Sequence, residues 1–317
     1  MPALPSDDSF RSASWCTVHP LSGPDQTAMA GLRAIAGPNK GKLRGVAARP
    51  VFDDLIRHTV EPQGVRYRED QVGGIAGWWC EPDGALDRVI LHLHGGWFNW
   101  GAAGAYRALV GHIALSANAN AFIPDYRLAP EHPFPGATID TSACLNGLLE
   151  RRPKAVAVTG DSAGGALALL SVAGGSAAHQ DRIVGVVALS PVTDLTLSGQ
   201  SWASRADADP FFVREQAQGL VDAYLAGHPP SDPAASALFE DLSGFPPVRV
   251  HVGDAEVLLD DSVRWTERAV AAGVDARLDI WEGLPHGFIG SIGQMQGADA
   301  ALMHIGAFLA ERFAAHR

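Results

Sequence analysis

Apolar residues in this chain occur as short continuous runs that alternate with segments of helical periodicity. Continuous apolar runs are typical of strands that a sheet buries on both faces. In one helical segment, Leu259, Val263 and Val270 fall on one face, and Gly273 is the expected end. The alternation predicts an α/β fold, a mostly parallel twisted sheet with helices on both faces. The predicted strands span 75–80, 88–94, 121–126, 156–159, 184–189, 248–252 and 276–281, and the predicted helices span 103–116, 138–151, 163–178, 258–272 and 298–314.

Residues 1–70 have a different pattern, in which helical stretches such as 26–36 are interrupted by proline and glycine and no core strand is obvious. We expect an N-terminal helical cap over 1–70 and an α/β domain over 71–317, with a candidate cap insertion at about 198–230. A mobile tail is the alternative for the first segment. The first two predicted strands are separated by a turn-forming Pro-Asp-Gly at 82–84, so we expect them to pair.

A glycine-flanked serine follows the fourth predicted strand. The pentapeptide at 160–164, Gly-Asp-Ser-Ala-Gly, fits the G-x-S-x-G nucleophile elbow, in which glycines let the backbone turn sharply. Apolar residues at helical spacing follow directly. The motif predicts that Ser162 stands at the carboxyl end of a strand as a nucleophile.

A second glycine-rich segment, His-Gly-Gly-Trp-Phe at 94–98, follows the strand predicted before it. Ester hydrolysis needs donors for the oxygen that becomes negative in the tetrahedral intermediate, and backbone N–H groups can supply them. We expect Gly96, Trp97 and Ala163 to donate to this oxygen, while Gly95 completes the oxyanion hole by shaping the turn with its neighbour His94. A plain β-turn is the alternative interpretation.

A histidine, His286, follows the last predicted strand and stands between a proline and a glycine. Imidazole titrates in the range that a base for a serine proton requires. His286 also completes the chain order serine, acid, histidine that G-x-S-x-G hydrolases use. It is therefore the candidate general base.

Together these motifs resemble the bacterial hormone-sensitive-lipase-like esterases of the α/β-hydrolase fold. The resemblance rests on residues 94–98, 125–137, 160–165 and 285–288, and it covers the chain from about residue 73 onward. It implies that 71–317 is a catalytic domain that hydrolyses carboxylic esters, prefers short acyl chains and is often dimeric. The third glycine of the usual H-G-G-G motif is replaced here by Trp97. The proline-rich motif at 125–137 is interpreted as a rigid, ion-paired loop near the site without a catalytic role.

Candidate acids follow the strand predicted at 248–252. In the family, the acid stands four residues before the first member of an acidic pair, and with Asp260 and Asp261 as that pair the spacing gives Glu256. Glutamate replaces the more common aspartate at this position. Asp254 is the alternative acid, whereas Asp260 and Asp261 fit the first turn of the next helix, where negative charge is favourable.

Large side chains near these motifs are candidates for an acyl pocket. We expect Phe98, Asp161, Phe212 and Phe288 to line the substrate pocket, with Trp97 restricting it to acyl chains of roughly two to six carbons. Packing in the core or cap is the alternative for the aromatic residues, in particular Phe212.

The composition of the chain limits the classes of partner that we expect it to bind. The 317 residues carry a formal net charge of −11 without a basic patch, which argues against nucleic acid as a partner. No apolar run approaches the roughly 20 residues of a membrane span, and no secretory signal pattern is evident. Cys16, Cys80 and Cys144 show no disulfide or metal spacing, so we expect a cytoplasmic protein without metal or organic cofactor.

The sequence therefore predicts a serine carboxylesterase that acts on small esters through an acyl-enzyme, either as a monomer or as a homodimer. A lactone hydrolase, for example on terpene-derived rings, is the alternative because the same triad opens cyclic esters. A non-catalytic receptor that binds a small ligand, as the plant gibberellin receptors do, is a remote alternative, since those relatives lack the histidine that this chain has at 286.

Overall fold

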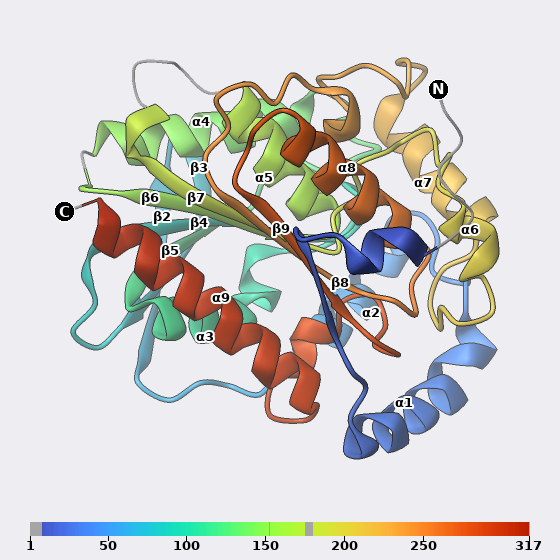
Figure 1. Ribbon diagram of the computed structural model, residues 1–317. Helices are drawn as coiled ribbons and strands as arrows, with labels where there is room; N and C mark the ends of the chain where they lie inside the picture. Colours follow the sequence, from blue (N-terminus) through green and yellow to red (C-terminus); the bar gives the residue numbers. More distant parts are fainter. Residues whose placement is uncertain (1–7, 152, 175–179, 317) are drawn as a thin grey trace.

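A nine-stranded sheet forms the centre of the molecule (Figure 1). The computed structural model describes residues 8–151, 153–174 and 180–316. The strand order is β1-β9-β8-β7-β6-β4-β5-β3-β2, and all neighbours are parallel except the pairs β2·β3 and β3·β5. The mostly parallel sheet predicted from the apolar runs is confirmed. The strands are β1 (Cys16–His19), β2 (Val65–Val72), β3 (Ile75–Pro82), β4 (Leu86–Leu93), β5 (Ala119–Pro124), β6 (Val156–Asp161), β7 (Ile183–Leu189), β8 (Val248–Gly253) and β9 (Ala276–Trp281).

Helices cover both faces of this sheet (Figure 1), with α3 and α9 packed together on one face and α4, α5 and α8 on the other. The predicted end of α8 at Gly273 is confirmed, because Gly273 takes a φ of +82° that favours glycine. The end of the helix predicted at 163–178 lies partly outside the described residues. The α-helices are α1 (Gly23–Ala36), α2 (Arg49–Ile56), α3 (Arg107–Ala117), α4 (Gly136–Glu150), α5 (Ala163–Ala173), α6 (Ser201–Ser204), α7 (Arg214–Leu225), α8 (Leu259–Ala271) and α9 (Gln296–Ala315). Short 3-10 helices are η1 (Asp8–Ser12), η2 (Gly37–Asn39), η3 (Val46–Ala48), η4 (Ala103–Ala105), η5 (Gln180–Arg182), η6 (Ala237–Phe239) and η7 (Phe288–Ser291).

The expected pairing of the first two predicted strands, now β3 and β4, is wrong. β5 lies between them, antiparallel to β3 and parallel to β4. The chain leaves β4, passes through α3 and returns as β5, which is the crossover that parallel neighbours require. After the Pro-Asp-Gly turn, the chain therefore passes over the position next to β3, which β5 occupies, and enters β4 one position further along the sheet.

The expectation that residues before 70 contribute no strand is also wrong, because β1 and β2 form the two edges of the sheet. β1 has only four residues, too few to display a two-residue period. β2 alternates half-buried Val65 and Tyr67 with exposed Arg66 and Arg68, a pattern typical of an edge strand. The N-terminal region thus combines cap helices with edge strands.

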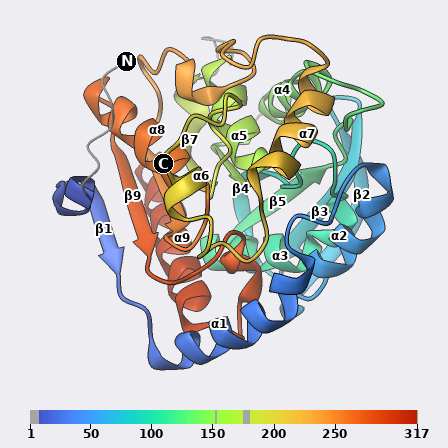
Figure 2. The same ribbon diagram turned by 90° about the vertical axis from the view of Figure 1, so that its right-hand side faces the viewer.

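The segment between α1 and α2 is tied to the insertion that follows β7. The Lys40 ammonium donates hydrogen bonds to the backbone carbonyls of Ala206 and Asp209. Gln216 of α7 donates to the carbonyl of Leu43 at 2.8 Å. Figure 2 shows α2, α6 and α7 over the same end of the sheet. Two segments that are far apart in the sequence are therefore hydrogen-bonded to each other, and their role as a cap stays a prediction.

The described helices do not include a membrane-spanning candidate. α9 is the longest at 20 residues, but even α9 lacks the apolar length that crossing a bilayer requires.

Candidate active site

The predicted elbow connects β6 to α5. Ser162 has a φ of 54° and a ψ of −122°, a strained conformation for a residue with a side chain. A Cβ at Gly160 would lie 2.2 Å from the carbonyl oxygen of Gly164, and one at Gly164 would lie 1.9 Å from that of Leu93. Only glycine fits these two positions, so the sequence motif follows from close backbone packing.

Backbone hydrogen bonds to the β7 side of the sheet hold the strained serine. The Ser162 N–H donates to the Leu189 carbonyl at 2.7 Å, and the Ser162 carbonyl accepts from the Val192 N–H at 3.1 Å. The Ser162 residue is 5% exposed. The nucleophile candidate is thus fixed at the end of β6 and largely shielded from bulk water.

The structure brings His286 and Glu256 together. His286 Nδ1 lies 3.3 Å from Glu256 Oε1, and the other carboxylate oxygen accepts a hydrogen bond from Ser190 Oγ at 2.8 Å. Glu256 is fully buried, and the His286 side chain is 10% exposed. A buried carboxylate with two polar partners can fix the tautomer and orientation of an imidazole.

The alternative acid, Asp254, has other partners. Its carboxylate forms an ion pair with Arg11 at 2.9 Å and accepts the Gly283 N–H at 2.5 Å. The geometry therefore favours Glu256 as the partner of His286. Asp260 and Asp261 lie in the first turn of α8 as expected, where they accept backbone N–H groups from the β7–α6 connection.

The charge of Glu256 affects the basicity of His286. Burial by itself lowers the pKa of His286, but the Glu256 charge and hydrogen bond outweigh burial and hold the pKa above its ordinary value of 6.5. Such a histidine is a stronger base than an isolated one, which suits removal of a serine proton.

The glycine-rich loop after β4 lies against the elbow. A Cβ at Gly95 would lie 3.1 Å from Ser162 Cβ. Gly96 and Trp97 have φ values of 118° and 55°. Within the described part of the chain, no acceptor takes the backbone N–H of Gly96 or Trp97. The first N–H of α5, at Ala163, likewise has no acceptor within its helix. These groups are available to a developing negative oxygen.

Asp161 anchors the turn that Gly95 is expected to shape. The Gly95 N–H donates to Asp161 Oδ1 at 3.0 Å, which fits a role in the turn and leaves donation to an oxyanion to its neighbours. The other Asp161 oxygen accepts from Tyr106 Oη at 3.2 Å. With both oxygens engaged, Asp161 holds the glycine-rich loop against β6. Its place in the substrate pocket stays a prediction.

Aromatic rings lie next to His286. The Phe212 ring packs edge to face against His286 at 5.1 Å and against Trp97 at 5.5 Å between centroids. Trp97 is 1% exposed. Phe212, in the insertion after β7, thus reaches the candidate catalytic histidine, and its expected place in the acyl pocket stays a prediction.

The other two expected pocket residues pack elsewhere. Phe98 is fully buried and stacks on Tyr224 of α7 at 4.0 Å. Phe288 belongs to the core on the α9 face and packs against Trp281 at 5.9 Å. For both residues the alternative of core packing holds, because the backbone directs each ring into a neighbouring element.

Sequence reasoning missed two polar residues. Ser190, which donates to Glu256, follows the apolar run of β7, so its place at a strand end was a usable signal. Asp209 is 1% exposed and accepts N–H groups from Phe212, at 2.9 Å, and Val257, at 2.9 Å. It joins the insertion to the Glu256 loop, and nothing in its local sequence marks this role.

The proline-rich motif at 125–137 forms a structural loop, as expected. Arg127 pairs with Asp140 at 2.6 Å, and Glu131 pairs with Arg49 of α2 at 2.7 Å. Tyr126 Oη donates to the His94 carbonyl at 2.6 Å. The loop therefore supports the glycine-rich segment from behind.

Comparison with known proteins agrees with this geometry. Residues 90–290 match a family described as the alpha/beta hydrolase fold. An esterase from Acinetobacter venetianus is 34% identical over 260 residues, which cover 80% of this chain and 85% of that protein. An acetyl-hydrolase from Streptomyces hygroscopicus is 33% identical over 217 residues, which cover 68% of this chain and 73% of that protein.

Solved structures give the same result. The crystal structure of an esterase from the bacterial hormone-sensitive lipase family has a TM-score of 0.84 and 32% identity, and the match covers 92% of this chain and 98% of that one. The hormone-sensitive-lipase homologue EstE7, from a metagenome library, has a TM-score of 0.85 and 31% identity, with 92% and 99% covered. This chain therefore belongs to the α/β-hydrolase fold family and is an esterase of its bacterial hormone-sensitive-lipase-like group.

Proposed function

We propose that the chain hydrolyses short-chain carboxylic esters with Ser162 as nucleophile, His286 as general base and Glu256 as the acid of the triad. The hydrogen bond from His286 to Glu256, which Ser190 holds from the other side, is the observation that supports this assignment best. A histidine held by a buried acid in this way supports a triad, because the acid orients the base that takes the serine proton.

The reaction proceeds in two halves. Ser162 Oγ attacks the ester carbonyl carbon while His286 Nε2 accepts the hydroxyl proton, because Nδ1 is engaged by Glu256. The carbonyl oxygen becomes negative and accepts N–H groups from Gly96, Trp97 and Ala163. The C–O bond to the alcohol then breaks, and His286 returns its proton to the leaving alkoxide.

Water completes the cycle. His286 removes a proton from a water molecule, the resulting hydroxide attacks the acyl-enzyme, and Ser162 regains its proton from His286 as the carboxylic acid leaves.

The proposed preference for short acyl chains rests on two aromatic side chains. Trp97 replaces a small residue at the oxyanion loop and is buried, and Phe212 packs between Trp97 and His286. Rings in these positions reduce the space beside the carbonyl carbon. We propose a pocket for acyl groups of roughly two to six carbons.

Ser162→Ala tests the proposed function. The variant should lose nearly all hydrolysis of nitrophenyl acetate and show no burst of nitrophenol, with a circular dichroism spectrum equal to that of the unchanged protein. Ser171→Ala is the matched control, because Ser171 is a buried serine of α5 whose hydroxyl bonds Leu167 and Thr141. Activity above a few per cent in Ser162→Ala would refute the assignment.

A substrate panel then defines the class. Nitrophenyl esters from acetyl to dodecanoyl, with several lactones beside them, should give their highest kcat/KM among the short linear esters. A higher kcat/KM on lactones would identify a lactone hydrolase.

We also propose a cytoplasmic enzyme that forms a homodimer. The three cysteines are unpaired, as in a reducing compartment. Light scattering after size-exclusion chromatography would determine the number of chains in the assembly.

A further inference from the structure

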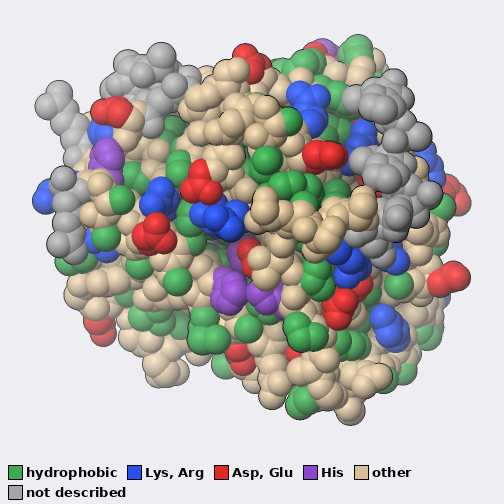
Figure 3. Space-filling view, in the orientation of Figure 1, with side chains coloured by type: hydrophobic (Ala, Val, Ile, Leu, Met, Phe, Trp, Pro, Cys, Tyr) green, Lys and Arg blue, Asp and Glu red, His purple; other side chains and the backbone are tan. Residues whose placement is uncertain are grey.

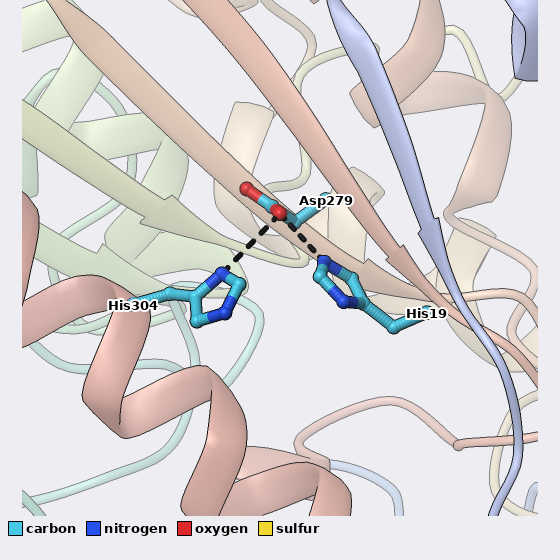
Figure 4. A group of neighbouring side chains, drawn as sticks. All are labelled: His19, Asp279 and His304. Atoms are coloured by element: carbon cyan, nitrogen blue, oxygen red, sulfur yellow. Dashed lines mark hydrogen bonds and ion pairs between the residues drawn. The ribbon is translucent and has the colours of Figure 1, made fainter.

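Two histidines and one aspartate meet at the β1 edge of the sheet, on its α9 face. Figure 4 shows His19 of β1 and His304 of α9 directed toward Asp279 of β9. His19 Nε2 lies 2.7 Å and His304 Nδ1 lies 3.7 Å from the same oxygen, Asp279 Oδ1. One ligand atom from each residue lies within 4.8 Å of the others. Three separate elements, of which β1 is remote in sequence from the other two, thus present their polar atoms to one point.

The distances and atom types suit a transition metal. Zinc binds imidazole nitrogen and carboxylate oxygen at about 2.0 to 2.2 Å in a tetrahedral site, which places ligand atoms about 3.3 to 3.6 Å apart. The distances to Asp279 Oδ1, 2.7 and 3.7 Å, lie on either side of this range. Two imidazoles also exclude magnesium and calcium as preferred ions, because both favour oxygen ligands.

Neighbouring rings hold the first histidine in place. The indole of Trp281 stacks on the His19 ring with 3.9 Å between centroids and 11° between planes. Buried His251 lies behind the carboxylate, with Nδ1 3.9 Å from Asp279 Oδ2. Such surrounding contacts fix the direction of ligand atoms in metal sites. A surface histidine without them would have no preferred orientation.

Solvent reaches the cluster from one side. The side chains of His19 and Asp279 are 18% and 13% exposed, whereas His304 is 48% exposed. Figure 3 shows histidine side chains grouped near the middle of the face that Figure 1 presents. A metal ion can therefore enter, water can complete its coordination, and the exposed His304 can adjust so that ligand atoms within 4.8 Å of one another close on the ion.

We propose that His19, Asp279 and His304 bind one divalent transition metal ion, with zinc as the expected ion. The ion would join the edge strand β1 to β9 and α9. This site is separate from the ester-hydrolysing residues, so it does not depend on the proposed function. The ion would stabilise the attachment of the N-terminal segment to the sheet.

Isothermal titration of the metal-free full chain with zinc chloride tests this proposal. We expect one zinc ion per chain and a rise in Tm with added zinc, whereas magnesium chloride should produce neither. Cobalt chloride should give visible absorption bands of a nitrogen- and oxygen-ligated site. His304→Ala should weaken zinc binding at least 10-fold, because it removes a ligand from an exposed helix position that alanine fits well.

His58→Ala is the matched control, because His58 is an exposed histidine just after α2 and is not one of the three cluster residues. It should leave the affinity for zinc and the rise in Tm unchanged. The proposal is overturned if the unchanged protein binds no zinc, if His304→Ala binds zinc as tightly as the unchanged protein, or if magnesium binds equally well. Esterase activity is measured separately, so the failure of the zinc proposal can be distinguished from the failure of the proposed catalytic triad.

Discussion

The carboxylate of Glu256 reaches two partners from a fully buried position, His286 on one oxygen and Ser190 on the other. Glutamate has one methylene group more than the aspartate that is more common at this position, and the loop after β8 accommodates the longer side chain. Asp254, two residues earlier, faces Arg11 instead. At the scale of residues, two neighbouring carboxylates in one loop therefore have different tasks.

Substitution of the two acids should separate these tasks. Glu256→Gln keeps the size of the side chain but removes the charge that orients and stabilises the His286 imidazolium, so kcat should fall by about 10⁴. Asp254→Asn breaks the ion pair with Arg11 and should change kcat far less. Steady-state kinetics on nitrophenyl acetate measure both values, and the reverse ranking would assign the acid to Asp254.

The pH profile provides an independent measure of the same contact. His286 must be neutral to accept a proton, and its pKa is raised above 6.5 because the Glu256 charge outweighs burial. The kcat/KM should therefore fall as pH decreases, with a midpoint above 6.5. In Glu256→Gln the midpoint of the residual activity should move to lower pH. A midpoint below 6.5 in the unchanged enzyme would contradict the proposed pair.

At the scale of elements, the loop after β4 is the most unusual segment. Trp97 and Phe98 both have positive φ values, 55° and 61°, in a region that disfavours residues with side chains. The Trp97 side chain compensates by packing between Phe212 and Trp202. A large buried ring thus stabilises a backbone conformation in which glycine would have no strain.

Trp97→Gly should change both selectivity and stability. Removal of a buried tryptophan costs about 3–5 kcal/mol of unfolding free energy, and relief of the positive φ returns about 1–2 kcal/mol, so Tm should fall. The space left beside Phe212 should move the preference toward longer acyl chains, since one methylene changes selectivity by about 1–3 kcal/mol. Both proteins are compared on one nitrophenyl ester series. An unchanged profile would place the Trp97 ring outside the pocket.

Sequence patterns predicted elements where burial is continuous. Most of the strands from β4 to β9 were recognisable because their apolar residues are buried on both faces, and the elbow was recognisable because Gly160 and Gly164 meet backbone atoms directly. β1 was missed because four residues carry no period. The partners of Asp209 and of Asp279 come from remote elements, so no local spacing could predict either contact.

At the scale of the whole molecule, the segment between α1 and α2 contacts the insertion that follows β7. Lys40 is one of the connections, because its ammonium donates to two carbonyls of the insertion that carries Phe212. That insertion also contacts the acid loop through Asp209 and Val257. Loss of the connection should therefore reach the active site through packing, without any change in its chemistry.

Lys40→Met tests this coupling, because methionine keeps most of the apolar stem and removes the charge and its hydrogen bonds. We expect a lower Tm and a higher KM for nitrophenyl butyrate, with kcat changed by less than about tenfold. Lys42→Met is the control, since Lys42 is exposed two residues away. Equal kinetics in the two variants would show that the connection does not affect substrate binding.

The position of β1 at the edge of the sheet also has a consequence in time. His19 of β1 and Asp279 of β9 are 260 residues apart in the sequence. At about 5–20 residues per second, a ribosome completes β9 roughly 15 to 50 s after β1. During this interval residues 16–19 have no strand to join, and when β9 forms it presents an open edge that another nascent chain could pair with. Attachment of β1 to β9 is therefore a late step of folding. It competes with pairing between the open β9 edge and another chain.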